Sequence, residues 1–113
     1  MPIAWHAPYD KLKPQTQDSA RAIQSLMEEL EAVDWYGQRV DVTDDDALRR
    51  ILEHNRDEEK EHASMLLEWI RRRDAKFDEK LRTYLFTKEI SSTSRKKLTN
   101  TKNDSRSMRH RFH

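Results

Sequence analysis

The sequence contains no cysteine, a single glycine (Gly37) and three prolines, all of which precede residue 15. Without cysteine the chain can form no disulfide, thiolate metal site or cysteine nucleophile, so any metal must be held by oxygen and nitrogen ligands. Since glycine and proline are almost absent after residue 15, little interrupts helices there, and the β-branched residues are too scattered to form strands. These absences predict an all-α fold.

Long hydrophobic runs are also absent. No apolar stretch approaches the length of a membrane span, and the N-terminal sequence MPIAWHAPYDKLKP has neither the basic start nor the apolar stretch of a signal peptide. We therefore expect a cytoplasmic protein with no membrane partner. Hydrophobic residues make up 35% of the 113 residues and charged residues 38%, which leaves little apolar material for a self-sufficient core. This balance predicts that the chain associates.

Charge is divided unevenly along the chain. Residues 91–113 hold seven Lys and Arg against one Asp, a net charge of +6, whereas residues 1–90 carry −5. The basic segment has few large apolar residues and is predicted to be disordered. We expect an N-terminal extension over residues 1–13, a helical domain over 14–90 and a basic tail over 91–113.

Two long helices are expected in the central part. Pro14 marks a helix start, and apolar residues then recur at helical spacing from about Ala22 to Val40. The run of Thr43 and three aspartates offers an N-cap, so a second helix should span about Asp44 to Arg73. Its acidic first turn and its last turn of three arginines match the helix dipole.

The short connection near residues 41–43 predicts that these helices form an antiparallel hairpin. Asp74 can cap a third, shorter helix that runs through Phe77, Leu81 and Leu85. A two-helix hairpin exposes one whole apolar face, so we expect a second chain to cover it and complete a four-helix bundle.

Each long helix carries a seam of residues spaced alternately by four and three, the a/d pattern of helices that pack around a shared core. The seam positions are Ala22, Leu26, Glu29, Val33, Tyr36 and Val40 in the first helix, and Leu48, Leu52, Asn55, Glu59, His62, Leu66 and Trp69 in the second. Each seam is apolar except at its middle, where the exceptions include Glu29, Glu59 and His62.

The two interruptions should lie at one level of the hairpin. Glu29 lies about thirteen residues before the turn and Glu59 about seventeen after it, and at a rise of ~1.5 Å per residue the two stand near the same height. No Arg or Lys occupies either seam at this level, and an unpaired buried carboxylate is costly. A metal ion fits the layer best; the alternative is a solvated charge run, which describes the neighbouring Asp57, Glu58 and Glu61.

Glu59 and His62 form a Glu-x-x-His sequence. Ferritin-like di-iron and di-manganese bundles use one Glu from each of two helices and Glu-x-x-His from each of the other two. One chain supplies Glu29 with Glu59 and His62, which is half of that set. A two-fold homodimer would complete both the core and the metal site at its interface.

Four stretches of the sequence resemble the encapsulated ferritins, ferritin-like proteins housed inside encapsulin shells. They are MEELEAVDWY (27–36), HNRDEEKEH (54–62), LEWIRRRDAKF (67–77) and RTYLFT (82–87). The resemblance implies a two-helix protomer, a dimer with the ferritin four-helix arrangement, and a ring-shaped decamer of five dimers in an encapsulin nanocompartment.

The resemblance also implies an activity, the oxidation of Fe(II) to Fe(III) by dioxygen (ferroxidase), with the iron stored in the surrounding shell. The di-iron ligands, contributed by each of two subunits, would be Glu29, Glu59 and His62. The other implied site residues are Tyr36, with a catalytic role, Trp35 beside the site, and the acidic pair Glu28 and Glu31, which would attract incoming iron and could hold calcium or another divalent ion.

The end of the chain differs from the family, whose members usually finish in a linker and a Gly-Ser-Leu peptide that docks to the shell wall. No such segment follows Ile90, so the basic tail is either a divergent docking peptide or a segment that binds an anionic surface.

Two other functions compete with the ferroxidase. A di-iron or di-manganese oxygenase or peroxidase would need a substrate pocket, for which a hairpin offers few residues. A helical scaffold with a nucleic-acid-binding tail leaves the seam carboxylates unexplained, so nucleic acid is not expected as a partner.

Overall fold

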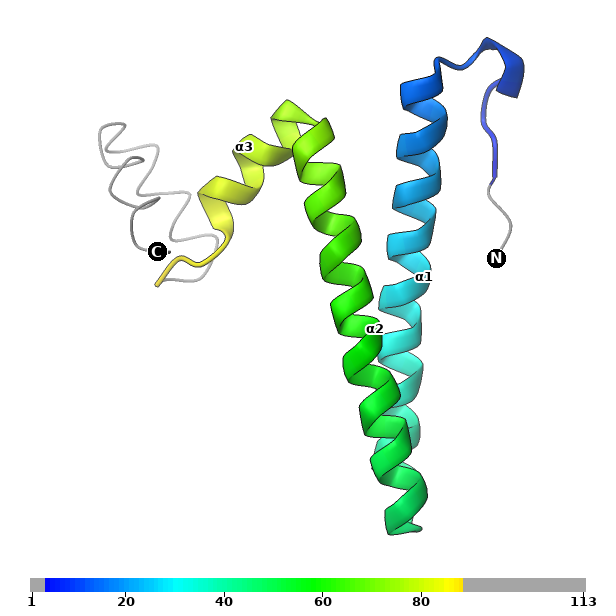
Figure 1. Cartoon of the computed structure of the whole chain (residues 1–113), viewed down its shortest axis with the longest axis vertical. Coiled ribbons are helices and arrows are strands. Elements are labelled where there is room, and N and C mark those ends of the chain that lie inside the picture. Colours follow the sequence, from blue (N-terminus) through cyan, green and yellow to red (C-terminus); the bar gives the residue numbers. More distant parts are fainter. Residues whose placement is uncertain (1–3, 89–113) are drawn as a thin grey trace. The chain divides into compact units, whose positions relative to one another are not determined.

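The computed structural model describes residues 4–88, and the predicted basic tail lies outside them. The elements, in chain order, are a short 3-10 helix η1 (Tyr9–Lys11), α1 (Pro14–Val42), α2 (Asp46–Arg73) and α3 (Ala75–Tyr84) (Figure 1). The described residues contain no strand, so the predicted all-α fold with two long helices and a short third one is confirmed. None of these helices is long and apolar enough to cross a membrane.

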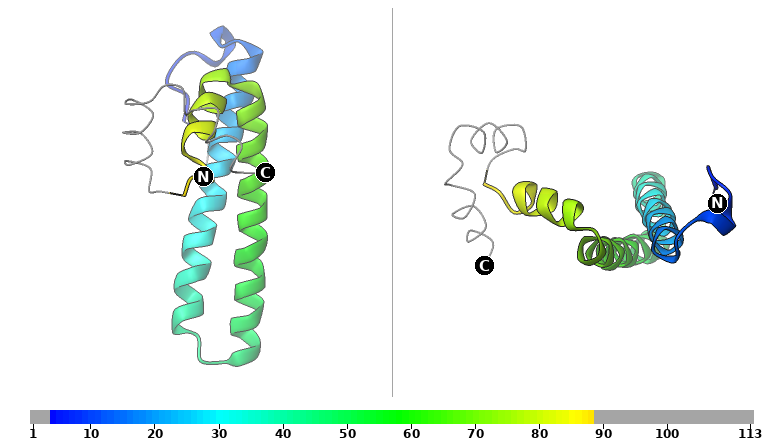
Figure 2. Two further views of the ribbon diagram at one scale, coloured as in Figure 1. Left: turned by 90° about the vertical axis from the view of Figure 1, so that its left-hand side faces the viewer. Right: turned by 90° about the horizontal axis from the view of Figure 1, so that it is seen from above.

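Helices α1 and α2 run side by side in opposite directions and form the predicted hairpin (Figures 1 and 2). At the end of α1 the Thr43 hydroxyl donates to the carbonyl of Arg39 at 2.5 Å. The side chain of Asp45 caps α2 instead, since its Oδ1 accepts from the backbone N–H of Leu48 at 2.8 Å. Within the predicted run of Thr43 and three aspartates the cap is therefore Asp45, because the Thr43 side chain already bonds to α1, and α2 begins at Asp46, two residues later than predicted.

The hairpin alone buries little apolar surface. Among the described residues the buried hydrophobic ones are Ala22, Ala63 and Ile70. Most seam positions are half-buried, but Leu48 is 48% exposed and Leu30, beside the seam, is 55% exposed. A hairpin with so small a core leaves much of its apolar surface in contact with water, which costs free energy.

The segment before α1 folds back onto that helix. Tyr9 lies at the centre of this contact: its hydroxyl accepts from Arg21 Nη2 at 2.6 Å, and its carbonyl accepts from Gln17 Nε2 at 3.1 Å. Trp5 packs edge-on against the Tyr9 ring, with the ring centroids 4.8 Å apart. Tyr9 thus ties the N-terminal segment to the first two turns of α1.

The chain divides into two compact units between Ile70 and Arg71. The second unit contains α3, whose N-cap is Asp74 as predicted, with its Oδ1 accepting from Phe77 N–H at 2.9 Å. Asp78 accepts from Arg71 Nη1 at 2.5 Å and from Arg82 Nε at 3.0 Å. These two guanidinium groups, Arg71 foremost, hold the pKa of the Asp78 carboxyl below its ordinary value.

Candidate metal centre

Helices α1 and α2 bring three potential metal ligands together in the middle of the hairpin. Glu29 comes from α1, whereas Glu59 and His62 lie one turn apart on α2, and one ligand atom from each lies within 4.8 Å of the others. In the described part of the chain no other group of three such residues converges in this way. Glu29 and Glu59 therefore lie at the same height along the hairpin, as the sequence predicted.

The three side chains are close but do not satisfy one another. His62 Nδ1 lies 3.6 Å from Glu29 Oε2 and 3.6 Å from Glu59 Oε2, which is too long for a hydrogen bond. Glu29 Oε2 is inaccessible to solvent and accepts no hydrogen bond. Because an unpaired buried carboxylate oxygen costs free energy, a cation bound beside Glu29 Oε2 would stabilise it.

The residues fit a divalent metal ion. Two ligands on opposite sides of one ion, each at ~2.1 Å, are about 4.2 Å apart, so spacings of 3.6 Å allow one ion to contact both atoms. Two carboxylates and one imidazole are a hard and borderline donor set that suits iron or manganese. The side chains of Glu29 and Glu59 are 24% exposed and that of His62 is 45% exposed, so the group remains open on the His62 side.

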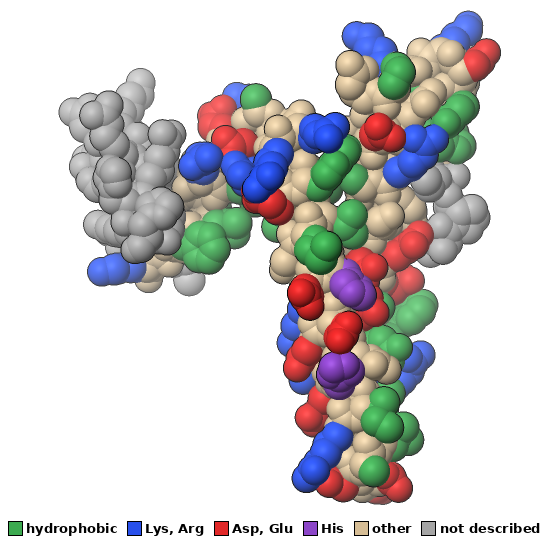
Figure 3. All heavy atoms as spheres, viewed as in Figure 1, with side chains coloured by type: hydrophobic (Ala, Val, Ile, Leu, Met, Phe, Trp, Pro, Cys, Tyr) green, Lys and Arg blue, Asp and Glu red, His purple; other side chains and the backbone are tan. Residues whose placement is uncertain are grey.

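Acidic side chains and histidine gather on one face of the hairpin around this level. Figure 3 shows red acidic and purple histidine side chains over the middle of the face turned to the viewer, with green hydrophobic side chains above, below and beside them. This arrangement makes that face of the hairpin attractive to cations.

Arg56 is a basic residue close to this level, but it does not occupy one of the seam positions. It lies one turn before Glu59 on α2, its side chain is 28% exposed, and its Nε is inaccessible without a hydrogen bond. This Nε lies 3.5 Å from Oδ1 of Asp57. Within residues 4–88, neither Glu29 nor Glu59 forms an ion pair with an arginine or a lysine, so the centre has no counter-cation of its own.

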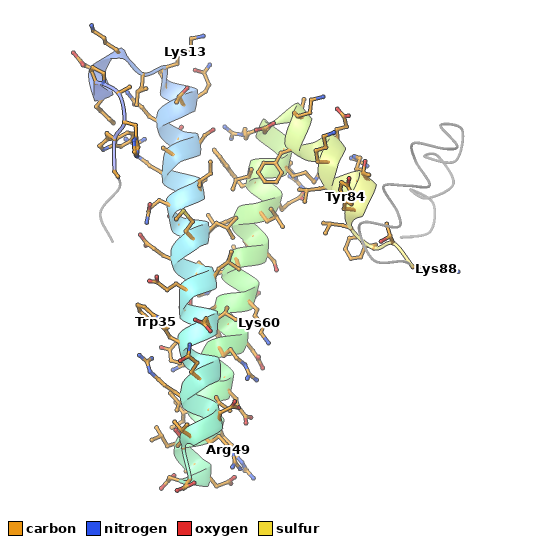
Figure 4. The ribbon with its side chains drawn as sticks, turned by 180° about the vertical axis from the view of Figure 1, so that it is seen from behind. Lys13, Trp35, Arg49, Lys60, Tyr84 and Lys88 are labelled. Atoms are coloured by element: carbon orange, nitrogen blue, oxygen red, sulfur yellow. The ribbon has the colours of Figure 1, made fainter. Side chains whose placement is uncertain are left out.

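The other predicted site residues all lie on α1 but do not join the three-residue group. Glu28 is exposed and accepts from Gln24 Nε2 at 3.2 Å, and Glu31, one turn on, is half-buried. Trp35 is 50% exposed and projects outward from α1 (Figure 4). Tyr36 is half-buried, and the guanidinium carbon of Arg39 lies 5.5 Å from the centre of its ring.

Comparison with known proteins places these observations in a family. An "Encapsulated ferritin-like protein" of Rhodospirillum rubrum is 66% identical over 82 residues, which are 73% of this chain and 59% of that protein. A "Ferritin-like protein" of Thermotoga maritima is 59% identical over 83 residues, 74% of this chain and 73% of that protein. The "Encapsulin nanocompartment cargo protein EncC" of Myxococcus xanthus is 38% identical over 71 residues, 59% of this chain and 55% of that protein. The chain thus spans little more than half the length of the Rhodospirillum and Myxococcus relatives.

A solved structure agrees with the fold. The crystal structure of protein ne0167 from Nitrosomonas europaea superposes with a TM-score of 0.73 at 59% sequence identity, covering 75% of this chain and 93% of that one. The sequence model of the EncFtn-like family matches residues 4–88, which include all three helices and the candidate metal centre. The chain therefore belongs to the EncFtn-like family of encapsulated ferritin-like proteins.

Proposed function

We propose that the protein is a ferroxidase, which oxidises Fe(II) to Fe(III) with dioxygen at a di-iron centre shared by two copies of the chain. The observation that carries the proposal is the group of Glu29, Glu59 and His62, with a buried Glu29 oxygen that lacks a hydrogen-bond partner. Family membership supports the proposal, because the residues matched by the family include all three ligands.

A second copy supplies what one hairpin lacks. One chain offers two carboxylates and one imidazole, so a two-fold pair offers four carboxylates and two imidazoles, the ligand set of a di-iron bundle. Four negative charges balance two Fe²⁺ ions. The same pairing covers exposed apolar side chains of the hairpin, so assembly of the site and burial of the core favour each other.

The ligands suit the reaction because carboxylates bind both oxidation states of iron. As each iron loses an electron, the negative charge of Glu29 and Glu59 stabilises the higher positive charge of Fe³⁺. The neutral His62 imidazole completes the donor set without adding charge. The exposed side of His62 leaves room for the ligands of the second copy and for incoming iron.

Other residues on α1 have proposed roles around this centre. Glu28 and Glu31 form an acidic pair that draws Fe²⁺, or another divalent ion such as Ca²⁺, toward the centre. Trp35 lies beside the site. Tyr36 takes part in the reaction from a half-buried position on the hairpin.

We further propose that five such dimers form a ring and that the oxidised iron is stored within an encapsulin shell. The Myxococcus xanthus relative is named as an encapsulin nanocompartment cargo protein, and the Rhodospirillum rubrum relative as an encapsulated ferritin-like protein. Enclosure in the cytoplasm by such a shell accounts for storage, because the two packed helices α1 and α2 are too few to enclose a mineral core.

Iron oxidation by purified protein tests the activity. Fe(II) is added in air and the ferric absorbance is followed for the wild type and for Glu29→Ala, Glu59→Ala and His62→Ala. We expect each variant to lose about tenfold or more of the initial rate, since changes to outer partners of a metal site already cost ~10–100-fold. Rates equal to that of the wild type would refute the proposal.

Glu58→Gln is the matched control. Glu58 precedes Glu59 on the same helix, but its side chain is 49% exposed and lies 3.0 Å from His54 rather than in the three-residue group. This variant removes one acid from the same turn of α2 and should retain the wild-type rate.

Replacing Glu28 and Glu31 together by Gln should slow the reaction only at low iron concentration, because the centre itself stays intact.

A further inference from the structure

Asn55 is a polar seam residue that neither the apolar core nor the proposed metal centre accounts for. It lies on α2, three residues after Leu52 and four before Glu59, and it is half-buried. Within residues 4–88 its side-chain amide makes no hydrogen bond, although an amide can donate two and accept two. Once a second copy covers the seam, water no longer reaches the amide, and a group of that copy must bond to it or the burial costs free energy.

An a/d seam by itself does not fix how two hairpins align. Because the pattern repeats every seven residues, a shift of one heptad again brings apolar residues opposite apolar residues. In a shifted pairing the Asn55 amide faces layers of the seam built from Leu48, Leu52 or Leu66, where nothing can bond to it. A polar residue at a single seam position specifies register and chain number in coiled coils, at a cost in stability.

The metal ligands cannot set the alignment before metal binds. In the proposed pair, Glu29 and Glu59 of both copies meet in one layer, and within residues 4–88 neither pairs with an arginine or a lysine. Four carboxylates without metal repel one another, so the ligand layer opposes the alignment that the centre needs. The Asn55 amide is uncharged and is both donor and acceptor, so it can bond across a two-fold axis without this repulsion.

We propose that Asn55 is a specificity residue of the interface between two copies of the chain, and that its amide bonds to a polar group of the second copy only when the two ligand sets are aligned. The inference rests on the proposed function, in which two copies share one centre. Asn55 and Glu59 are four residues apart on one face of α2, so this bond lies about 6 Å along the helix from the ligand layer. Pairing through Asn55 therefore aligns the ligands before the metal arrives.

Asn55→Leu tests the assignment, because stability and specificity should change in opposite directions. With a chelator present, we expect the variant to melt several degrees higher than the wild type by circular dichroism, since leucine replaces an amide in an apolar seam. With Mn²⁺, we expect a wider range of assemblies than the wild type gives in native mass spectrometry, and about tenfold weaker Mn²⁺ binding by calorimetry. A residue that only packs would shift melting and metal binding in the same direction.

Two further variants complete the experiment. Aspartate has nearly the size of asparagine but adds a carboxylate from each copy, so Asn55→Asp should weaken both pairing and Mn²⁺ binding. Tighter Mn²⁺ binding with wild-type assembly would instead make residue 55 a metal ligand and overturn the proposal. Gln38→Leu is the control, since Gln38 is an exposed amide outside the seams that donates to Asp34 Oδ1 at 3.1 Å. It should assemble and bind Mn²⁺ as the wild type does.

The outcomes separate this inference from the function on which it rests. If Asn55→Leu assembles and binds Mn²⁺ as the wild type does, the role of Asn55 is wrong and the ferroxidase proposal stands. If the wild type assembles with Mn²⁺ but does not oxidise Fe(II), the ferroxidase proposal is wrong, and the comparison with Asn55→Leu still decides the role of Asn55. A wild type that stays monomeric with Mn²⁺ would overturn both.

Discussion

Gly37 is the only glycine in the chain, and it lies in the interior of α1. Its φ is not positive, and a Cβ atom built on it would meet only the Arg56 Cδ at 4.0 Å, an ordinary van der Waals contact. Glycine in a helix interior costs up to ~1 kcal/mol relative to alanine. We therefore expect Gly37→Ala to raise the free energy of unfolding by about 0.5–1 kcal/mol, measured by urea denaturation followed by circular dichroism.

Ala32→Gly is the reverse control on the same helix, at a half-buried position, and should lower the free energy of unfolding by a similar amount. If Gly37→Ala instead destabilises the protein, the methyl group meets something closer than Arg56. In that case we would infer that the proposed second copy contacts α1 near Gly37.

The convergence of the three candidate ligands could be predicted from the sequence because helix geometry fixes their positions. Glu29, Glu59 and His62 interrupt regular seams, and a rise of ~1.5 Å per residue on both sides of a short turn sets their level. Arg56 could not be predicted in the same way. Its burial depends on how its long side chain packs beside Gly37, which the a/d pattern does not describe.

At the level of elements, the join between α2 and α3 depends on Asp78. This carboxylate accepts from Arg71 of α2 and from Arg82 of α3, and the pair of guanidinium groups holds its pKa below the ordinary value. A group whose pKa is lower in the folded state stabilises that state above its unfolded pKa, and the contribution is lost as pH falls through the folded pKa.

We expect Asp78→Asn to lower the melting temperature at neutral pH, because the amide accepts less strongly from both arginines. The difference from the wild type should shrink once the pH falls below the ordinary range of an aspartate. Thermal melts at a series of pH values measure this. Glu79→Gln is the control, since it changes the neighbouring acid, which pairs with the exposed Lys76, and should give a small difference at neutral pH. A difference for Asp78→Asn that stays constant down to the lowest pH would contradict the linkage.

Helix ends were predicted less well than helix centres. The start of α1 at Pro14 and the Asp74 cap of α3 follow from local preferences that no neighbour opposes. Between α1 and α2, four successive residues could each cap a helix, and the Thr43 hydroxyl bonds to α1 while Asp45 caps α2. The packing of residues 4–12 against α1 depends on Tyr9, Gln17 and Arg21, whose contacts join positions eight and twelve apart that no helical period relates.

At the scale of the whole molecule, the exposed apolar surface and the three-residue candidate centre both support the proposed second copy of the chain. The described residues expose large hydrophobic side chains on both long helices, Ile23 and Met27 on α1 and Ile51 and Met65 on α2. The centre offers three ligands from one chain, with carboxylates that have no counter-cation. Since metal would bind the pair of chains better than a single chain, metal binding should shift the protein toward the larger assembly.

Analytical ultracentrifugation with and without Fe²⁺ under argon, or with Mn²⁺ in air, tests this coupling. We expect divalent metal to raise the mass from the monomer or dimer toward a decamer, and a chelator to reverse the shift. In Glu29→Ala the added metal should leave the mass unchanged, because the site loses a carboxylate from each subunit, whereas Glu58→Gln should behave as the wild type. A monomeric mass with metal present, together with a full cooperative helical melt, would mean that one hairpin is stable alone, and the proposed link between the shared core and the shared metal site would be wrong.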